Sequence, residues 1–406
     1  MKLFLSLAWR NIWRNKRRTI LAALSIFFSV FLALITRSMQ NGTYDYMIDS
    51  AVRMYTGYIQ IHAKGYWNER SLEKSFVYDK NLFGKIEKIE YVENAVPRLE
   101  NFLLVSSKEI TKVASAVCIE PEKENLMTGL EKKLIHGKYL NEYDEGILIS
   151  EGLTKMLNVN VGDSVVLYGQ GIYGFTAYAL SPIIGIIKFN LPDMNNSLIY
   201  LPLRYGQNLF SMENRVTSVS LMLNNPKKLN SVYEQIKSLL TNNYEVMKWD
   251  EMMPELVQGI EIDSISGIFM LFILYLIIAF GIFGTIMMMT AERTKEFGIL
   301  ISIGMKKSIL IFISILETIF ISFIGAFAGL LISIPVIFYL NKNPIQFTGE
   351  LAELSLKFGV EPILPFSIDA GIFFAQTLII LIISLFSALY PVRYIKKLQP
   401  IKAMRQ

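Results

Sequence analysis

The sequence predicts a membrane protein with four transmembrane α-helices and a large α+β extracytoplasmic (periplasmic) domain inserted between helices one and two. Only 18% of its 406 residues are charged, against roughly 25% in a soluble globular domain. The uncharged residues gather in four long runs, and a polar stretch of about 225 residues separates the first run from the second. That stretch is long enough to fold as a domain with a core of its own.

Each apolar run is long enough to span a bilayer core, which takes about 20 residues of helix. The runs after Arg18, Asp263 and Asp369 contain 18, 28 and 23 uncharged residues, and the run 308–341 carries only Glu317. Transmembrane helices are therefore expected at 19–38, 264–290, 308–340 and 370–391. The first run could also belong to a cleaved signal peptide, but it is too long for one and no small-residue cleavage site follows it, so we predict an anchor.

Lysine and arginine set the orientation of these helices. Six of them lie in residues 1–18, four in the short loop 291–307 and five in the tail 392–406. Four spans bring these three segments to one side of the membrane, so the positive-inside rule places the loop and both termini in the cytoplasm. We expect the chain in the cell inner membrane, with residues 39–263 in the periplasm. The net charge of +5 follows from this bias and indicates contact with anionic lipid, with no nucleic-acid partner.

Residues 1–18 are expected to form an interfacial amphipathic helix. Trp9 and Trp13 are four residues apart, as are Arg10 and Arg14, so a helix places an aromatic edge beside a basic edge. Such a helix lies in the inner membrane interface. The alternative is a simple basic flank of the first transmembrane helix.

The periplasmic domain mixes strand and helix patterns. Residues 55–66 alternate in the manner of a strand, whereas 226–243 has the period of an amphipathic helix, so an α+β domain of two lobes is expected. Cys118 is the single cysteine, which allows no intramolecular disulfide and indicates a buried structural thiol. The outer loop 341–369 contains three prolines and is expected to be irregular.

No catalytic or metal-binding constellation is recognisable in the sequence. The Gly-x-x-x-x-Gly-Lys-Ser/Thr phosphate loop and the Gly-x-Ser-x-Gly nucleophile elbow are both absent. His62 and His136 are far apart in sequence, and one cysteine completes no metal or nucleophile set. We predict a protein that is not itself an enzyme, with no catalytic residues, no metal and no cofactor of its own.

A few residues inside the predicted membrane helices stand out. Glu317 would be costly against lipid, so it faces the helix bundle or reaches the inner headgroups, and a functional role and a structural hydrogen bond both remain open. Gly281 and Gly284, and Gly325 and Gly329, are expected to let helices approach closely.

The segment TAERTKEFGILISIGMKK, residues 290–307, places charges and glycines between two apolar runs. It could be an electrostatic stop signal, but an apolar side chain such as Phe297 needs burial if it lies outside the membrane. We expect a short helix from Ala291, broken near Gly298 or Gly304, that presents Phe297 beside flanking charges to a groove on another protein.

The longer segment ERTKEFGILISIGMKKSILIFISILETIFISFIGAFAGL, residues 292–330, resembles the permease family that includes macrolide exporters, lipoprotein-releasing permeases and the cell-division FtsX proteins, the transmembrane subunits of type VII ABC transporters. The matching residues are Glu292, Arg293, Glu296, Gly298, Leu300, Gly304, Leu316 and Glu317. Three further segments are also similar to that family. They are LAWRNIWRNKRRTILA near the N-terminus, YPVRYIKKLQPIKAMR near the C-terminus and DEGILISEGLTKMLNVNVGDSVVL in the inserted domain. The resemblance covers the whole chain and, through GYIQIHAKGY, is closest to the lipoprotein-releasing branch.

The resemblance implies the permease half of an ABC transporter. Two permeases pair, as a homodimer or a homologous heterodimer, and each docks a cytoplasmic ABC ATPase, so two separate ATPase copies bind ATP and Mg. The ATPase-coupling residues carried onto this sequence are Glu292, Arg293, Thr294, Lys295, Glu296, Phe297 and Gly298. ATP hydrolysis then drives a conformational change of the periplasmic domain.

For the lipoprotein-releasing branch the resemblance implies extraction of a lipoprotein or lipid-like substrate from the outer leaflet of the inner membrane, for transfer toward the outer membrane. The alternatives are a macrolide or peptide efflux permease, an FtsX-like regulator of a periplasmic hydrolase, and a sensor of an antibiotic signal. A periplasmic carrier or adaptor is a further candidate partner, although the interval YGQGIYGFTAYALSPII is short for a full carrier-binding hook.

A substrate cavity is expected between the first two transmembrane helices of facing permeases. Its predicted lining is Phe28 and Phe31 from the first helix and Ile268 and Phe272 from the second. Both helices are rich in Phe, Ile, Leu and Met, which accommodate acyl chains without fixed geometry. The alternative is that these side chains meet bulk lipid, as most transmembrane surface does.

Overall fold

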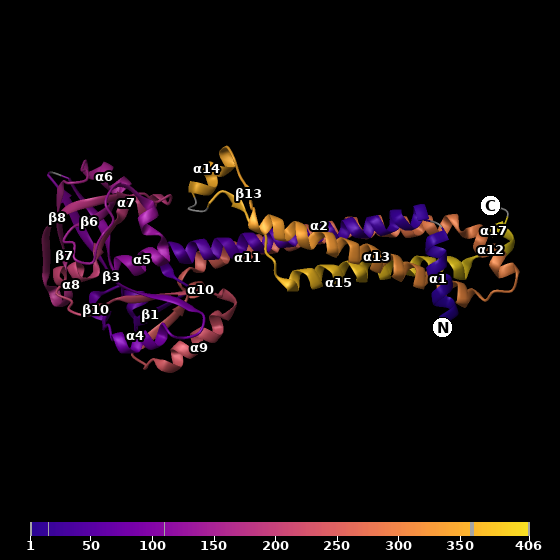
Figure 1. Ribbon diagram of the computed structural model, residues 1–406, viewed down its shortest axis with the longest axis horizontal. Helices are drawn as coiled ribbons and strands as arrows, with labels where there is room; N and C mark the ends of the chain where they lie inside the picture. The colour runs from indigo at the N-terminus through magenta and orange to yellow at the C-terminus, as the bar shows by residue number, and fades with distance from the viewer. Residues whose placement is uncertain (1, 15, 109, 358–360, 405–406) are drawn as a thin grey trace. The chain divides into compact units, whose positions relative to one another are not determined.

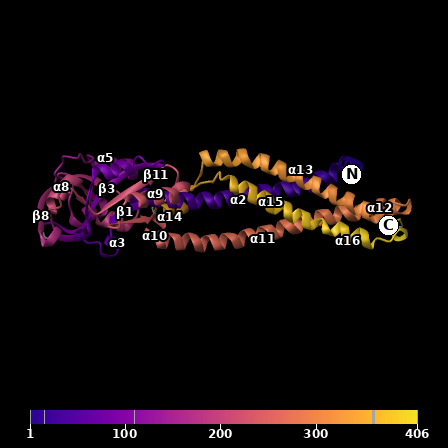
Figure 2. The same ribbon diagram turned by 90° about the horizontal axis from the view of Figure 1, so that it is seen from below.

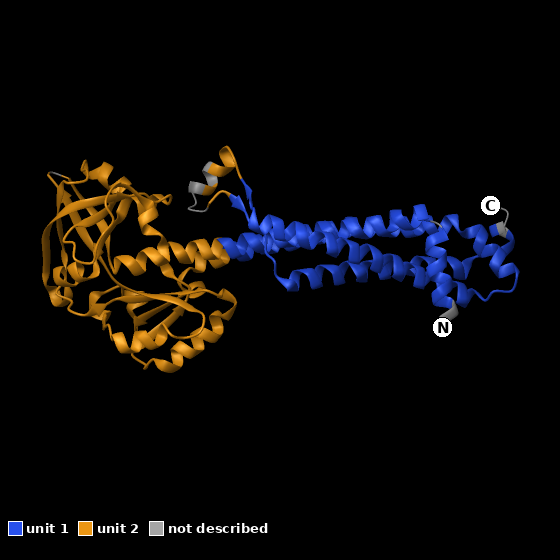
Figure 3. Ribbon diagram, in the orientation of Figure 1, with its two compact units in different colours: residues 1–46, 259–346, 363–406 blue, residues 47–258, 347–362 orange. Residues whose placement is uncertain are grey.

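The computed structural model describes residues 2–14, 16–108, 110–357 and 361–404 (Figure 1). The chain divides into two compact units, each built from segments that are far apart in sequence (Figure 3). The first unit holds residues 1–46, 259–346 and 363–406, and the second holds residues 47–258 and 347–362.

Helices make up most of the first unit. They are α1 (Lys2–Arg14), α2 (Lys16–Ala51), α11 (Pro254–Glu292), α12 (Thr294–Ser302), α13 (Lys307–Lys342), α15 (Ala370–Ser387), α16 (Leu389–Lys397) and α17 (Pro400–Met404). The long helices run lengthwise in one bundle (Figure 1 and Figure 2). Four segments of the described chain are long and apolar enough to cross a membrane, namely Lys16–Thr56, Pro254–Glu292, Lys307–Lys342 and Ala370–Lys397.

The first three long helices extend beyond the apolar runs that predicted them. α2 has 36 residues, α11 has 39 and α13 has 36, whereas about 20 residues cross a bilayer core. After α2 the chain continues as a π-helical turn, η1 (Val52–Thr56), and only Gly57, with φ of +73°, ends it. A helix ends where its backbone conformation changes, as it does at Gly57, so the length of an apolar run underestimates the length of the helix.

The glycine pair in α13 brings two helices of the bundle together. A Cβ atom on Gly325 would lie 2.6 Å from the carbonyl oxygen of Ala23, and one on Gly329 would lie 2.9 Å from that of Phe27. α13 therefore contacts α2 backbone to backbone, which confirms the prediction for this pair.

The glycine pair in α11 has no such neighbour. A Cβ atom on Gly281 or Gly284 would have nothing within 4 Å among the described residues, so no described helix of this chain approaches closely there. A close approach by a helix of a second permease stays a prediction. α11 is also the least covered of the four membrane segments. Its most apolar window is 17% buried, against 39% to 44% in the other three.

The N-terminal helix α1 lies across the long helices (Figure 1). Ala8 and Ile12 are buried, and the Trp9 ring packs edge-on against Phe320 with 5.8 Å between ring centroids. Trp13 is 51% exposed. The helix thus has one side in the bundle and an aromatic side outside it. That this side lies in the membrane interface stays a prediction.

A ten-stranded mixed sheet organises the second unit. Its order is β12-β1-β11-β3-β4-β9-β6-β8-β5, with β7 paired to β3 and β8. The strands are β1 (Ile59–Ala63), β3 (Val92–Ser107), β4 (Ile110–Ile119), β5 (Leu134–Gly137), β6 (Ile147–Ser150), β7 (Ser164–Gln170), β8 (Thr176–Ile187), β9 (Leu198–Pro202), β11 (Ser218–Leu223) and β12 (Tyr244–Lys248). The 16-residue strand β3 pairs with β11, β4 and β7, so one sheet connects what the sequence suggests as two lobes.

Short helices accompany this sheet. They are α3 (Tyr66–Glu69), α4 (Lys80–Ile86), α5 (Pro121–Thr128), α6 (Glu151–Leu157), α7 (Pro192–Ser197), α8 (Leu203–Leu209), α9 (Leu229–Leu239) and α10 (Trp249–Met252). Strands β2 (Phe76–Val77) and β10 (Arg215–Val216) form a separate pair. Cys118 is fully buried, as predicted, and burial raises the pKa of its thiol. The predicted fold class, four membrane helices with an α+β domain between the first two, is confirmed.

The outer loop 341–369 is more regular than expected. Strands β13 (Ile345–Gln346) and β14 (Ile363–Leu364) pair with each other, and the chain between them forms the helix α14 (Glu350–Lys357). Pro344 and Pro362 each stand just before a strand, where a missing N–H does not interrupt the pairing. The prediction of an irregular loop is therefore wrong here, and residues 358–360 lie outside the described chain.

Candidate functional site

α12 carries most of the predicted coupling residues. α11 ends at Glu292, Arg293 forms the corner with φ of −94° and ψ of 5°, and α12 starts at Thr294. Gly304 has φ of +102°, which other residues rarely adopt, and it separates α12 from α13. Of the two expected breaks, the one at Gly304 is present, and the helix passes through Gly298 without interruption.

One face of α12 is buried by the chain's own helices. It holds Thr294, Phe297 and Gly298. Phe297 is 3% exposed and packs with Leu310 of α13 and Ile395 of α16. The expectation that Phe297 is presented to another protein is therefore wrong. At 3.6 residues per turn, positions 294, 297 and 298 share one face, and neighbouring helices cover it.

The acidic residues at this corner pair within the chain. A carboxylate oxygen of Glu292 lies 2.5 Å from Nε of Arg18, at the start of α2. Arg14 of α1 donates through Nη2 to Glu296 at 2.8 Å. These contacts connect the corner to the N-terminal helices, 274 and 282 residues away in sequence.

Arg293 and Glu317 form the buried part of this charge network. Arg293 donates through Nη1 to one carboxylate oxygen of Glu317, and Asn11 donates through Nδ2 to the other at 2.7 Å. Burial lowers the pKa of Arg293, but the negative charge of Glu317 outweighs this and raises it above its ordinary value. Glu317 thus faces the bundle, which is one of the two predicted orientations, and its partners are Asn11 and Arg293.

The opposite face of α12 is exposed. Lys295 and Ile299 of α12 and Ile303, the residue directly after its end, follow one another at four-residue spacing, and the two isoleucines are 44% and 76% exposed. We call these three residues the α12 ridge. An apolar ridge with a cation at one end fits an apolar groove with an acidic rim. Ile303 was missed from the sequence, although a helical period counted along α12 places it beside Ile299.

The seven predicted coupling residues therefore lie together at one corner, but they differ in exposure and in their contacts. Lys295 belongs to the exposed ridge. Glu292, Arg293 and Glu296 are engaged in ion pairs inside the chain. The remaining three are turned inward.

The four predicted cavity residues lie on the outer faces of α2 and α11. Phe28, Ile268 and Phe272 are 53%, 57% and 59% exposed. Phe31 is half-buried and stacks on Phe27 with 6.1 Å between ring centroids. This chain alone does not enclose them, so a cavity there needs a second chain.

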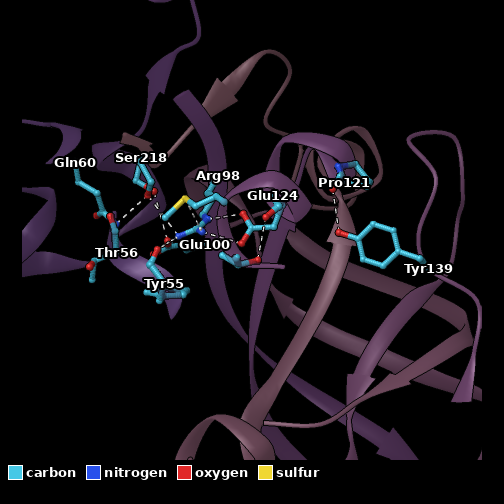
Figure 4. A network of polar contacts seen from close by, with 12 residues as sticks. Tyr55, Thr56, Gln60, Arg98, Glu100, Pro121, Glu124, Tyr139 and Ser218 are labelled. Atoms are coloured by element: carbon cyan, nitrogen blue, oxygen red, sulfur yellow. Dashed lines mark hydrogen bonds and ion pairs between the residues drawn. The ribbon is translucent and has the colours of Figure 1, made fainter. Parts of the chain in front are cut away.

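A polar network is buried in the second unit (Figure 4). Arg98 of β3 and Glu124 of α5 are both 0% exposed and make two contacts of 2.8 Å between guanidinium nitrogens and carboxylate oxygens. Arg98 also donates to the backbone carbonyl of Tyr55 in η1. The network therefore ties the turn after α2 to β3 and α5. No local pattern in the sequence indicates it. Among the described residues no group of three or more His, Cys, Asp or Glu side chains could hold a metal.

An apolar row runs across four antiparallel strands of the second unit. Val113 of β4 faces Leu104 of β3, which faces Tyr168 of β7, which faces Tyr178 of β8. Their exposed fractions are 62%, 38%, 50% and 65%. We call these four residues the aromatic sheet face. The interval YGQGIYGFTAYALSPII, residues 168–184, which is short for a carrier-binding hook, includes most of the β7–β8 hairpin. Tyr173 lies at the tip of this hairpin and is 81% exposed.

The other face of the same strands is buried, with Leu103, Val105 and Leu167 at 4% exposure or less. An antiparallel sheet with one face in the core usually has a polar outer face. An outer face of tyrosine, leucine and valine is instead typical of an interaction surface.

Two known families match this chain. Residues 268–400 match the FtsX-like permease C-terminal family, and residues 19–239, more than half of the chain, match the MacB-like periplasmic core domain. The lipoprotein-releasing system transmembrane protein LolC of Buchnera aphidicola is 23% identical over 98% of this chain and 97% of its own length. LolC of Neisseria meningitidis serogroup B is 22% identical over 80% and 81% of the two chains. An uncharacterized ABC transporter permease of Methanocaldococcus jannaschii is 20% identical over 81% and 82%.

Solved structures of two related domains align with part of this chain. The periplasmic region of MacB from Actinobacillus actinomycetemcomitans gives a TM-score of 0.37 at 17% identity, over 52% of this chain and 95% of that one. The extracellular domain of the transporter YknZ gives 0.36 at 14% identity, over 47% and 99%. The family of this chain is decided by the two family matches, over residues 19–239 and 268–400. The chain belongs to the FtsX-like and MacB-like family of ABC transporter permeases.

Proposed function

We propose that this permease extracts lipoproteins from the outer leaflet of the inner membrane, using ATP hydrolysis by a separate cytoplasmic ATPase. The observation that carries the ATP-driven part of the proposal is the geometry of α12, with an exposed ridge on one face and a buried, ion-paired face on the other. Lys295, Ile299 and Ile303 supply the docking surface. In this proposal the α12 corner and both termini are cytoplasmic, because the three basic segments of the chain adjoin them.

A force applied to the ridge would reach the bundle through the buried face. Phe297 packs on α13 and α16, and Arg293 is paired with Glu317 of α13. Separating a buried ion pair costs several kcal/mol, because each charge would lose its partner without regaining water. α12 therefore moves with α13 when the ATPase changes shape, and the bundle passes the movement on to the periplasmic domain.

The lipoprotein substrate is supported by the two LolC relatives and by the outer faces of α2 and α11. A second permease, identical or homologous, would face α11, the least covered membrane helix, and enclose Phe28, Ile268 and Phe272. Each buried methylene of an acyl chain contributes roughly 0.8 kcal/mol, so such a cavity retains a multiply acylated substrate without polar recognition.

The aromatic sheet face supports a soluble partner on the periplasmic side. Tyrosine is enriched at protein interfaces because it buries much area with few rotatable bonds. A carrier or adaptor would receive the substrate there. A regulator of a periplasmic hydrolase would use the same surface, so the identity of the partner distinguishes the two functions.

Co-purification from native membranes tests the proposal. Ile299→Asp and Ile303→Asp place a charge on the ridge without disturbing the core, since both positions are exposed. We expect the ATPase to be lost from both variants. Leu126→Asp, at a position 72% exposed in α5, is the matched control and should retain it.

Mass spectrometry of the retained material tests the substrate in the same preparation. The proposal expects lipoprotein in the wild-type complex. ATPase retention by both ridge variants would contradict the docking assignment. A retained peptidoglycan hydrolase without lipoprotein would contradict the extraction function and favour the regulator.

A further inference from the structure

A cavity of about 520 Å³ lies between α12, α16 and α17. Tyr390 and Tyr394 of α16 are stacked along it, with 5.8 Å between ring centroids. Arg393 and Lys397 also line it, because residues three, four and seven positions apart share a face of a helix. We call it the basic cavity.

The charge of the basic cavity is uncompensated. Arg393 and Lys397 are exposed, and neither forms an ion pair in the described chain. No carboxylate is among the described residues that line the cavity. Glu292 and Glu296 do not line the cavity, and they pair with Arg18 and Arg14. The cavity therefore favours an anion.

The basic cavity lies at the end of a membrane segment. Arg393 and Lys397 belong to the last turns of the fourth span, Ala370–Lys397. Exposed apolar side chains precede them, with Phe386 at 68% and Leu389 at 50%. Phe283 of α11 packs edge-on against Tyr390, with 5.4 Å between ring centroids. An apolar surface thus leads from the membrane span to the cavity. The acyl chain of a lipid can pack along this surface, whereas a free phosphate has no apolar part to do so.

We propose that the basic cavity binds the headgroup of an anionic phospholipid. Arg393 and Lys397 hold the phosphate through charge-assisted hydrogen bonds, and the rings of Tyr390 and Tyr394 cover the glycerol and the first methylenes. Tyrosine is enriched at this depth of a membrane for the same reason, since it has an apolar body and a polar tip. The inference requires only that the fourth span lies in a bilayer, and it does not depend on the transported substrate.

The bound lipid would touch the start of α12. The Tyr394 hydroxyl shares a hydrogen bond of 2.7 Å with the hydroxyl of Thr294, at the start of α12. Thr294 itself lines the cavity. A headgroup in the cavity therefore contacts a side chain that anchors α12 to α16.

Native mass spectrometry of the full chain released from nanodiscs tests the proposal. The discs contain phosphatidylcholine with a minor share of phosphatidylglycerol, and the ratio of the two lipids that remain bound is measured. Arg393→Gln and Lys397→Gln are each expected to lower the retained phosphatidylglycerol about fivefold. Lys396→Gln is the matched control, because Lys396 is exposed on the same helix but does not line the cavity, and it should leave the ratio unchanged.

Three results would overturn the proposal. Equal loss in Lys396→Gln would mean that surface charge alone attracts the lipid. Displacement of the lipid by millimolar inorganic phosphate would identify a site for a free anion. Unchanged phosphatidylglycerol in the two cavity variants, with loss of a co-purified ATPase, would identify a protein-docking surface.

Discussion

Arg98 and Glu124 make the second unit sensitive to single substitutions. Each is fully buried, and the pair satisfies its charges through a bidentate contact. Arg98 has further acceptors in the Tyr55 carbonyl and the Ser220 hydroxyl. Burial lowers the pKa of Arg98, but the Glu124 charge raises it by more, so the guanidinium stays ionised. Removing one partner would leave the other charge buried without compensation.

We expect Arg98→Met to lower the free energy of unfolding of the periplasmic domain by about 3 to 5 kcal/mol. Pulse proteolysis of the full chain in urea measures it. The double variant Arg98→Met with Glu124→Leu should recover a large part of the loss, since no unpaired charge remains. Lys155→Met, which breaks the surface pair with Glu151, is the control and should change little. A double variant as unstable as the single one would show that packing, and not charge, explains the loss.

At the scale of elements, the two glycine pairs have different consequences. Gly325 and Gly329 allow α13 to touch the backbone of α2, whereas Gly281 and Gly284 leave one side of α11 open. The same sequence pattern therefore marks a contact inside the chain in one helix and an unpartnered surface in the other. Only the neighbours of each helix distinguish the two.

Alanine substitutions should separate these cases. Gly325→Ala places a Cβ 2.6 Å from a backbone oxygen that cannot move away, so we expect a loss of roughly 1 to 3 kcal/mol from overpacking. Gly284→Ala meets nothing and should be neutral or slightly stabilising, because alanine is the better helix former. Thermal unfolding of the purified chain in one detergent compares them. Equal stability of the two variants would contradict the close contact between α13 and α2.

At the scale of the whole molecule, the exposed apolar faces of α2 and α11 are not covered by the described chain itself. α11 has the lowest buried share of the four membrane segments, although it is as apolar as the others. Lipid can cover such a face, and so can a second permease. The proposed transporter uses the second option, with the substrate held between the two chains.

Photo-crosslinkers at Phe28, Ile268 and Phe272 test this arrangement. In a native membrane we expect them to capture lipoprotein, because acyl chains would occupy the space that these side chains line. Phe327 of α13 is the control, since it is 66% exposed on another helix, and it should capture phospholipid only. Capture of phospholipid alone at all four positions, with normal lipoprotein release by variants charged at the first three, would leave these residues as ordinary lipid-facing surface.

The sequence by itself determined the membrane spans, the inserted domain and the position of the short charged segment between the second and third spans. These follow from local properties, namely the length of an apolar run and the charges between two runs. The fold class could be predicted for that reason. The coupling role that the family resemblance gives to the α12 corner stays a prediction. The ends of the helices could not be predicted from the apolar runs, because polar residues continue a helix until a residue such as Gly57 breaks it.

Only the tertiary structure decided which side of α12 is available. Phe297 is the more conspicuous residue in the sequence, but α13 and α16 cover it and leave Ile299 and Ile303 outside. The pairing of Glu317 with Arg293 and the burial of Arg98 beside Glu124 were likewise invisible in the sequence. Burial and ion pairing depend on residues far away in the chain, and their neighbours are set by packing rather than by any local pattern.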